Sequence, residues 1–290
     1  MVKVNLPDRP PLSMHIDCTG EGAPAVILDA GLGDSFISWH KVQPQIAEFT
    51  RVCSYDRAGI GYSSPTSGPR TSQAIADELN ALLHAADVPP PYVLVGHSMG
   101  GYDVRVFANS YRSEVAGVVL VDASHPDQEK RFPRELENME GSWLREAEFL
   151  EYTTPFGIPR LLGLCDDNAV ERAVECNFHT ERERVAEMKA FPVSGAEAGS
   201  SGTLGDLPLA VLSHDPEKPS AELPADLAQQ TNQAWEKMQE ELAHLSTRGI
   251  QTIAKNSAHY IQIDRPDVVV EGIRKVVQEA RTASTVNPKP

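Results

Sequence analysis

The chain has 290 residues, of which 41% are hydrophobic, and its 26 basic and 41 acidic residues give a formal net charge of −15. This length and apolar content allow a sizeable buried core and exclude a chain that is mostly disordered. The negative charge disfavours nucleic acid or an anionic membrane as a partner, and no apolar run approaches the roughly 20 residues of a membrane-spanning helix.

The first eleven residues and the cysteines favour a reducing compartment. Residues 1–11 lack the apolar core of a signal peptide. The four cysteines, Cys18, Cys53, Cys165 and Cys176, form no C-x-x-C pair and no Cys/His cluster with zinc-ligand spacing. We therefore expect buried free thiols in the cytoplasm, with a Cys165–Cys176 bridge as the alternative that their spacing permits.

Short apolar segments alternate with helical ones in the first half of the chain. Strands are predicted over 25–28, 51–55, 92–95 and 117–122, and an amphipathic helix over 72–88. Because the strands are almost continuously apolar, the alternation predicts an α/β fold with a mostly parallel central sheet and helices on both faces.

The alternation breaks after His125 and resumes after Gly205. Residues 126–205 are polar, acidic and helical, with Ser194–Gly205 expected to be a flexible return. We predict an α/β core over 1–125 and 206–290, with 126–205 as a helical cap inserted after the sixth strand. Later elements are a strand over 208–213, a helix over 229–245, a strand over 249–254 and a helix over 267–280.

The sharpest motif is Gly96-His97-Ser98-Met99-Gly100, which fits G-x-S-x-G and lies between a predicted strand and a predicted helix. Glycines let the strand and helix approach closely around a strained turn that exposes the serine. The helix N-terminus offers the Met99 N–H to an anion. The motif predicts Ser98 as a nucleophile.

A serine hydroxyl needs an adjacent base to become a good nucleophile. Among nine histidines, His259 lies in SAHYIQIDRP, just after the last predicted strand and before the last helix. A loop there reaches the same edge of the sheet as Ser98. His97 neighbours the serine in sequence but is expected to point elsewhere.

These segments resemble the α/β-hydrolase superfamily over Ala25–Tyr111 and Pro208–Ala280. The matching pieces are DAGLGDSFISW, YDRAGIGYSS, GHSMGG and SAHYIQIDRP. The resemblance implies that Ser98 is the nucleophile, His259 the general base, and the N–H groups of Met99 and Leu32 the oxyanion hole. It also implies that Asp56 and Arg57 of YDRAGIGYSS belong to a structural turn that supports the site.

The acid that completes a Ser-His-Asp triad stays open at this point. Asp215 follows the strand 208–213, the position where most of the superfamily carries the acid, but Ser-His-Asp matches the usual motif poorly. Asp122 ends the strand 117–122, where some branches place it, and Asp127 is a further candidate. Asp122 and Asp215 are the main competitors.

The expected function is hydrolysis of carboxylic esters or similar acyl compounds through an acyl-enzyme intermediate. The partner is a small-molecule ester or acyl substrate, with no nucleic acid, no membrane, and no metal, nucleotide or other cofactor. Alternatives on the same residues are lactone, amide or carbon–carbon bond hydrolysis, or a slow-turnover receptor for a small molecule. Whether the chain is a monomer or a homodimer stays open.

Overall fold

The computed structural model describes residues 1–7, 9–165, 176–218 and 223–286. A seven-stranded sheet has the order β3-β5-β4-β6-β7-β8-β9, and β3 alone runs antiparallel to its neighbour. The strands are β3 (Ile16–Thr19), β4 (Ala25–Asp29), β5 (Val52–Tyr55), β6 (Tyr92–His97), β7 (Val115–Val121), β8 (Leu209–His214) and β9 (Gly249–Ala254). A separate hairpin pairs β1 (Val2–Val4) with β2 (Leu12–Met14). The predicted mostly parallel sheet is confirmed.

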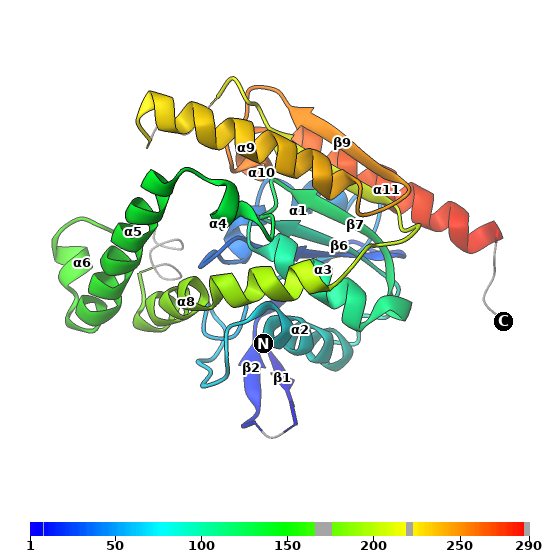
Figure 1. The fold of residues 1–290 in the computed structure, drawn as a ribbon. Helices are drawn as coiled ribbons and strands as arrows, with labels where there is room; N and C mark the ends of the chain where they lie inside the picture. Colours follow the sequence, from blue (N-terminus) through cyan, green and yellow to red (C-terminus); the bar gives the residue numbers. More distant parts are fainter. Residues whose placement is uncertain (8, 166–175, 219–222, 287–290) are drawn as a thin grey trace.

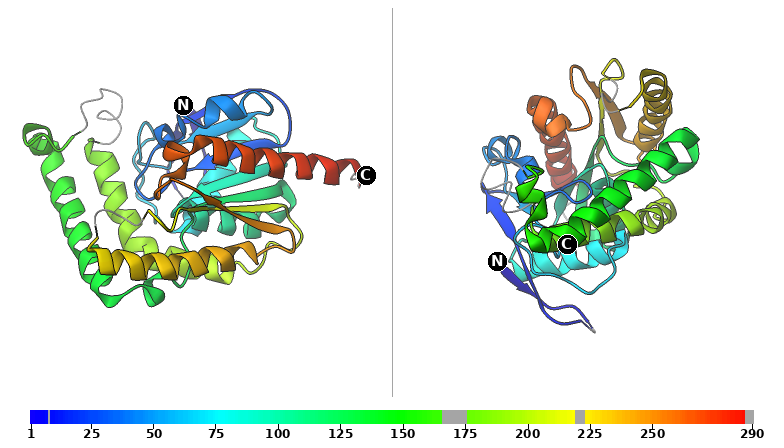
Figure 2. Two further views of the ribbon diagram at one scale, coloured as in Figure 1. Left: turned by 90° about the horizontal axis from the view of Figure 1, so that it is seen from above. Right: turned by 90° about the vertical axis from the view of Figure 1, so that its left-hand side faces the viewer.

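Helices cover both faces of this sheet, as its apolar strands require (Figures 1 and 2). Alternate side chains of each strand enter different cores: Leu94 and Leu120 lie in one, Val95 and Val121 in the other. The first core is closed by α2 (Ser72–Ala85), α3 (Gly100–Ser110) and part of α9 (Ala225–Ala243). The second is closed by η1 (Phe36–Trp39), α1 (Gln43–Ile46), α10 (Ile261–Asp264) and α11 (Pro266–Val286).

The regular elements that the structure describes between β7 and β8 are helices joined by short loops. These helices are α4 (Gln128–Arg131), α5 (Arg134–Thr153), η3 (Thr154–Phe156), α6 (Ile158–Leu161) and α8 (Phe178–Ser200). In Figure 1, α5 and α6 stand to one side of the sheet, and α8 returns along α3. The insertion follows β7, which is the seventh strand of the chain and the fifth of the main sheet in chain order, rather than a sixth strand.

The expected flexible return at Ser194–Gly205 is wrong over its first half, since α8 continues to Ser200. The small residues there let α8 pack closely on the core. Ser194 Oγ accepts a hydrogen bond of 3.0 Å from the Ser72 N–H, and a Glu197 carboxylate oxygen accepts one of 2.8 Å from the Gln73 N–H. The end of α8 therefore satisfies the unpaired N–H groups at the start of α2.

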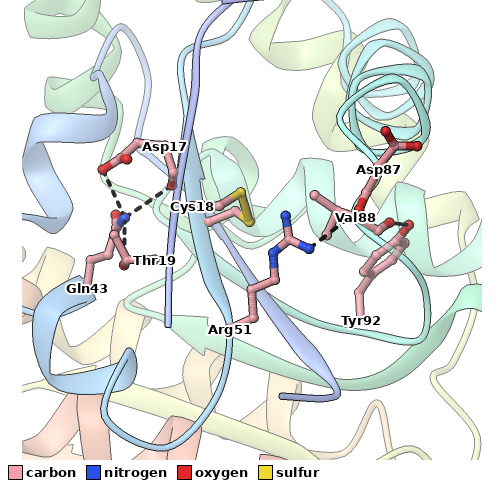
Figure 3. The surroundings of a disulfide bond; sticks show 9 residues. Asp17, Cys18, Thr19, Gln43, Arg51, Asp87, Val88 and Tyr92 are labelled. Carbon is pink, nitrogen blue, oxygen red and sulfur yellow. Dashed lines mark hydrogen bonds between the residues drawn. A yellow bond between two sulfur atoms is a disulfide. The ribbon is translucent and has the colours of Figure 1, made fainter. Parts of the chain in front are cut away.

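The expectation of free thiols is also wrong. Cys18 and Cys53 are direct register partners on β3 and β5 and form a disulfide (Figure 3). Cys165 and Cys176 form a second. All four cysteines lie in the described residues, and none of them is free. Two disulfides are typical of proteins in oxidising compartments and argue against the expected reducing cytoplasm. None of the described helices has the length and apolarity of a membrane span.

Candidate active site

The carboxyl ends of the parallel strands bring the candidate residues to one edge of the sheet. Ser98 follows β6, Asp122 follows β7, Asp215 follows β8, and the loop with His259 follows β9. Register places His97 opposite Val121, so Ser98 and Asp122 leave adjacent strands side by side. This edge is where open α/β sheets bind ligands.

The turn at Ser98 has the strained geometry that its glycines predict. Ser98 has φ 51°, in the left-handed region that side chains rarely adopt, and its N–H donates to the Val121 carbonyl at 3.2 Å. A Cβ on Gly96 would lie 2.3 Å from the Gly100 carbonyl oxygen, and one on Gly100 would lie 2.6 Å from that of Ala30. Neither position can hold a larger residue without moving the backbone.

His259 meets Asp122 rather than any other candidate acid. Its Nδ1 lies 2.7 Å from Asp122 Oδ2, and the Asp122 side chain is fully buried at a backbone with φ 42°. The hydroxyl of Ser98 has no hydrogen-bond partner among the described residues, and catalytic hydrogen bonds are often long before substrate binds.

Asp122 is held ionised by what surrounds it. Burial opposes its charge, but hydrogen bonds from the imidazoles of His214 and His259, together with their positive charges, keep the pKa of the carboxyl far below its usual range. An ionised acceptor at this position fixes the Nδ1–H tautomer of His259 and leaves its Nε2 free to accept a proton.

Asp215 is occupied elsewhere. One of its carboxylate oxygens accepts from the Asn256 N–H at 2.8 Å, and the other lies 3.1 Å from Lys255 Nζ. Asp127 lies at the surface, 2.8 Å from Lys130 Nζ. The structure thus brings Asp122 to His259 and places the other two acids in local networks.

His97 supports the histidine loop. Its Nε2 lies 3.1 Å from the His259 carbonyl oxygen, and the two rings are 4.7 Å apart between centroids. Burial, and the nearby charge of His259, lower the pKa of His97 to about 3, so it is neutral and donates this hydrogen bond from Nε2. As expected from the sequence, the His97 side chain is directed elsewhere: it contacts the histidine loop rather than the Ser98 hydroxyl.

Two backbone N–H groups in the loops at this edge of the sheet have no partner among the described residues. They belong to Leu32 and Met99, whereas the N–H of Gly33 donates to Glu187 Oε2 at 2.8 Å. Met99 lies at the N-terminal end of α3, where the helix dipole favours an anion. Both predicted oxyanion donors are therefore unpaired.

Arg57 holds the loop that carries Leu32. Its guanidinium donates to the carbonyls of Ala30 at 2.8 Å and Gly31 at 2.6 Å, and it pairs with Asp29 at 3.0 Å and with Glu187 at 2.7 Å. The sequence predicted a supporting role for this turn but missed Glu187, because nothing in the sequence distinguishes that residue from the many other acidic residues of the insertion. Burial, against the opposing charge of Arg57, raises the pKa of Asp29 to about 6.

Two further residues that the sequence analysis missed contact Asp122. Trp235 Nε1 donates to Asp122 Oδ1 at 2.9 Å, and its ring packs against the edge of His259 at 6.1 Å between centroids. The other is His214, the last residue of β8. Its position directly before Asp215 at a strand end was a signal that could have found it. The described residues contain no cluster of three or more potential metal ligands.

Comparison with known proteins identifies the family. A family model for the alpha/beta hydrolase fold matches residues 24–151. The chain is 30% identical over 251 residues to the uncharacterised protein YqjL of Bacillus subtilis, covering 86% of this chain and 82% of that one. Its structure is similar to a thermophilic esterase from Thermogutta terrifontis, with a TM-score of 0.68, 22% identity, and coverage of 96% of this chain and 98% of the esterase. It is also similar to an enol-lactonase from Burkholderia xenovorans, with a TM-score of 0.61, 19% identity, and coverage of 92% and 96%. The chain belongs to the α/β-hydrolase family.

Proposed function

We propose that the protein is a serine hydrolase that cleaves carboxylic esters through Ser98, His259 and Asp122. The observation that carries the proposal is the 2.7 Å contact between His259 Nδ1 and the buried Asp122, beside a serine in a strained turn. The Leu32 and Met99 N–H groups have no partner among the described residues and can serve as oxyanion donors, and an acyl-transfer site needs this set of groups.

In the proposed reaction, Ser98 Oγ attacks the ester carbonyl carbon while His259 Nε2 takes its proton. The carbonyl oxygen becomes an oxyanion that accepts hydrogen bonds from the Leu32 and Met99 N–H groups, each worth about 3 kcal/mol in the transition state. The intermediate collapses, and the leaving alkoxide receives the proton from His259. Water, deprotonated by His259, then attacks the acyl-enzyme, and the acid leaves as Ser98 Oγ takes the proton back from His259. Asp122 stabilises the imidazolium in both halves.

Among acyl substrates, esters are favoured by the solved structures that are similar to this one. The similar structures include an esterase and an enol-lactonase, whose substrates both contain an acyl–oxygen bond. A serine in the turn argues against the displacement chemistry of the haloalkane dehalogenases, one of which shares this fold with a TM-score of 0.71 at 16% identity.

Residues 126–205 would then act as a cap over the acyl site. Glu187 of α8 supports this, because its carboxylate contacts both the Gly33 N–H and Arg57 and so ties the insertion to the oxyanion loop. Apolar side chains on α5, η3 and α6 are exposed to a degree unusual for a surface, including Tyr152, Phe156 and Leu161.

The test is hydrolysis of a p-nitrophenyl ester series from acetate to palmitate, with Ser98→Ala as the matched inactive variant. We expect turnover by the wild type and loss by at least about 1,000-fold in the variant. Equal rates for the two proteins would refute the serine mechanism. If neither protein cleaves any ester while Ser98 fails to react with acylating reagents, the function belongs to another class.

A further inference from the structure

The buried carboxylate of Asp122 serves two histidines. His259 Nδ1 lies 2.7 Å from Oδ2, and His214 Nδ1 lies 2.9 Å from Oδ2 and 3.0 Å from Oδ1. Oδ1 also accepts from the His214 backbone N–H at 3.0 Å and from Trp235 Nε1 at 2.9 Å. A triad needs only the contact with His259, so the second imidazole requires an explanation.

The partners of His214 fix its protonation state. Asn232 Nδ2 donates to the Pro216 carbonyl at 3.0 Å, which orients the amide so that its Oδ1 faces His214 Nε2 at 3.0 Å. An amide oxygen only accepts, so Nε2 carries a hydrogen. Nδ1 faces an ionised carboxylate, which also only accepts, and therefore carries a hydrogen too. His214 is an imidazolium.

The charged surroundings agree with this state. Burial disfavours the charge of His214, but the hydrogen bond and the negative charge of Asp122 outweigh it and raise the pKa of the imidazole. The charge of Asp215 acts in the same direction. Five titratable groups surround His214. They are Asp122 just after β7, Asp215 and Lys255 in the loops after β8 and β9, Glu236 on α9 beside a small adjoining cavity, and His259.

We propose that His214 is a positioning residue that keeps a second positive charge on Asp122 and so sets the pH range in which His259 is a neutral base. In a triad with one histidine, the full negative charge of the acid favours the imidazolium of the base. A cation on the same carboxylate offsets that preference, so the carboxylate favours protonation of the base less strongly. This inference rests on the proposed function of His259 as the general base.

The first test is the pH profile of kcat/KM for the best ester. His214→Asn keeps an uncharged N–H donor near the position of Nδ1. We expect the acidic limb of the profile to move to higher pH by about one unit. That is the size of a Coulomb interaction between two charges that share one carboxylate, at a dielectric constant between those of protein and water. Asn232→Leu keeps the ring but removes the acceptor from Nε2, and should move the limb in the same direction. His84→Asn, which changes an exposed histidine paired with Glu114, is the control and should leave the limb in place. Unchanged limbs in both His214→Asn and Asn232→Leu would overturn the inference.

A second readout does not depend on turnover. In the Ser98→Ala background, ¹H–¹⁵N spectra of the imidazoles should show both nitrogens of His214 protonated at pH 7.5 while His259 is neutral. His214→Asn should then raise the pH at which His259 titrates by about one unit. A neutral His214 at pH 7.5 would overturn the inference even if the enzyme proves active. Absence of ester turnover with the expected spectra would refute only the proposed substrate.

Discussion

Replacing Arg57 with methionine should destabilise the protein strongly and disable the oxyanion loop. The guanidinium is 2% exposed and joins the fully buried Asp29 and Glu187 with two loop carbonyls. Breaking a buried ion pair by removing one partner costs about 3 to 5 kcal/mol, because the remaining charge stays buried. For a chain of this size that corresponds to a fall in Tm of about 10 °C.

Arg265→Met is the matched control. Arg265 also forms a two-pronged pair with a carboxylate, Asp267, at 2.7 and 2.9 Å, but at the surface, so its loss should cost less than about 1 kcal/mol. Urea unfolding and ester kinetics would be measured for both variants. We expect kcat/KM to fall about 100-fold in Arg57→Met, the cost of misplacing one oxyanion donor, and to be unchanged in Arg265→Met.

The pH dependence identifies the cause of the loss. Burial raises the pKa of Asp29 and the charge of Arg57 opposes that effect, so without Arg57 the pKa of Asp29 in the folded state lies further above its value in the unfolded chain. The stability that such a group contributes is lost as pH rises. The unfolding free energy that Arg57→Met loses relative to the wild type should therefore become smaller as pH falls from about 8 to 5. Equal unfolding midpoints for Arg57→Met and Arg265→Met would refute the reasoning.

Further predictions concern the acid, the turn and a disulfide. Asp122→Asn should lower kcat by about 10⁴-fold and Asp215→Asn by less than about tenfold; similar losses in steady-state ester assays would contradict the assignment. Because the pKa of Asp122 is lowered in the folded protein, its contribution to stability is present above pH 3.8 and is lost as pH falls below that value. On acidification, the unfolding free energy of Asp122→Asn should therefore fall less than that of the wild type. Gly100→Ala places a methyl group 2.6 Å from a backbone oxygen and should abolish activity and lower Tm, whereas an unchanged Tm would exclude the predicted clash. Replacing Cys18 and Cys53 together with serine opens a loop of 35 residues and should cost about 4 kcal/mol in urea unfolding; an intact mass showing free thiols in the wild type would contradict the bridge.

The sequence predicted the parts of this molecule that depend on local pattern. Ser98 could be found because a G-x-S-x-G turn between an apolar strand and a helix has one steric solution, and the close approaches at Gly96 and Gly100 are that solution. His259 could be found because the ends of parallel strands share one edge. The order of the motifs along the chain then indicated the family.

The rest depends on contacts between distant segments. Asp122 and Asp215 both directly follow strands, and only the register of β7 against β6 and β8 shows which side chain reaches His259. The partner of Arg57 in the insertion is 130 residues away and the partner of His214 on α9 is 18 residues away, so no local pattern indicates them. The Gly/Ser-rich end of α8 looked like a loop because its helix is stabilised by packing on α2 rather than by its own propensities.

The central claim is that Ser98 is a nucleophile activated by His259 and Asp122. The most direct measurement is the reaction with a fluorophosphonate, followed by peptide mass spectrometry. We predict one adduct per chain, located on Ser98, that is absent in Ser98→Ala and forms at least about 100-fold more slowly in His259→Ala. Labelling at another residue, or equal labelling rates in the wild type and His259→Ala, would contradict the account.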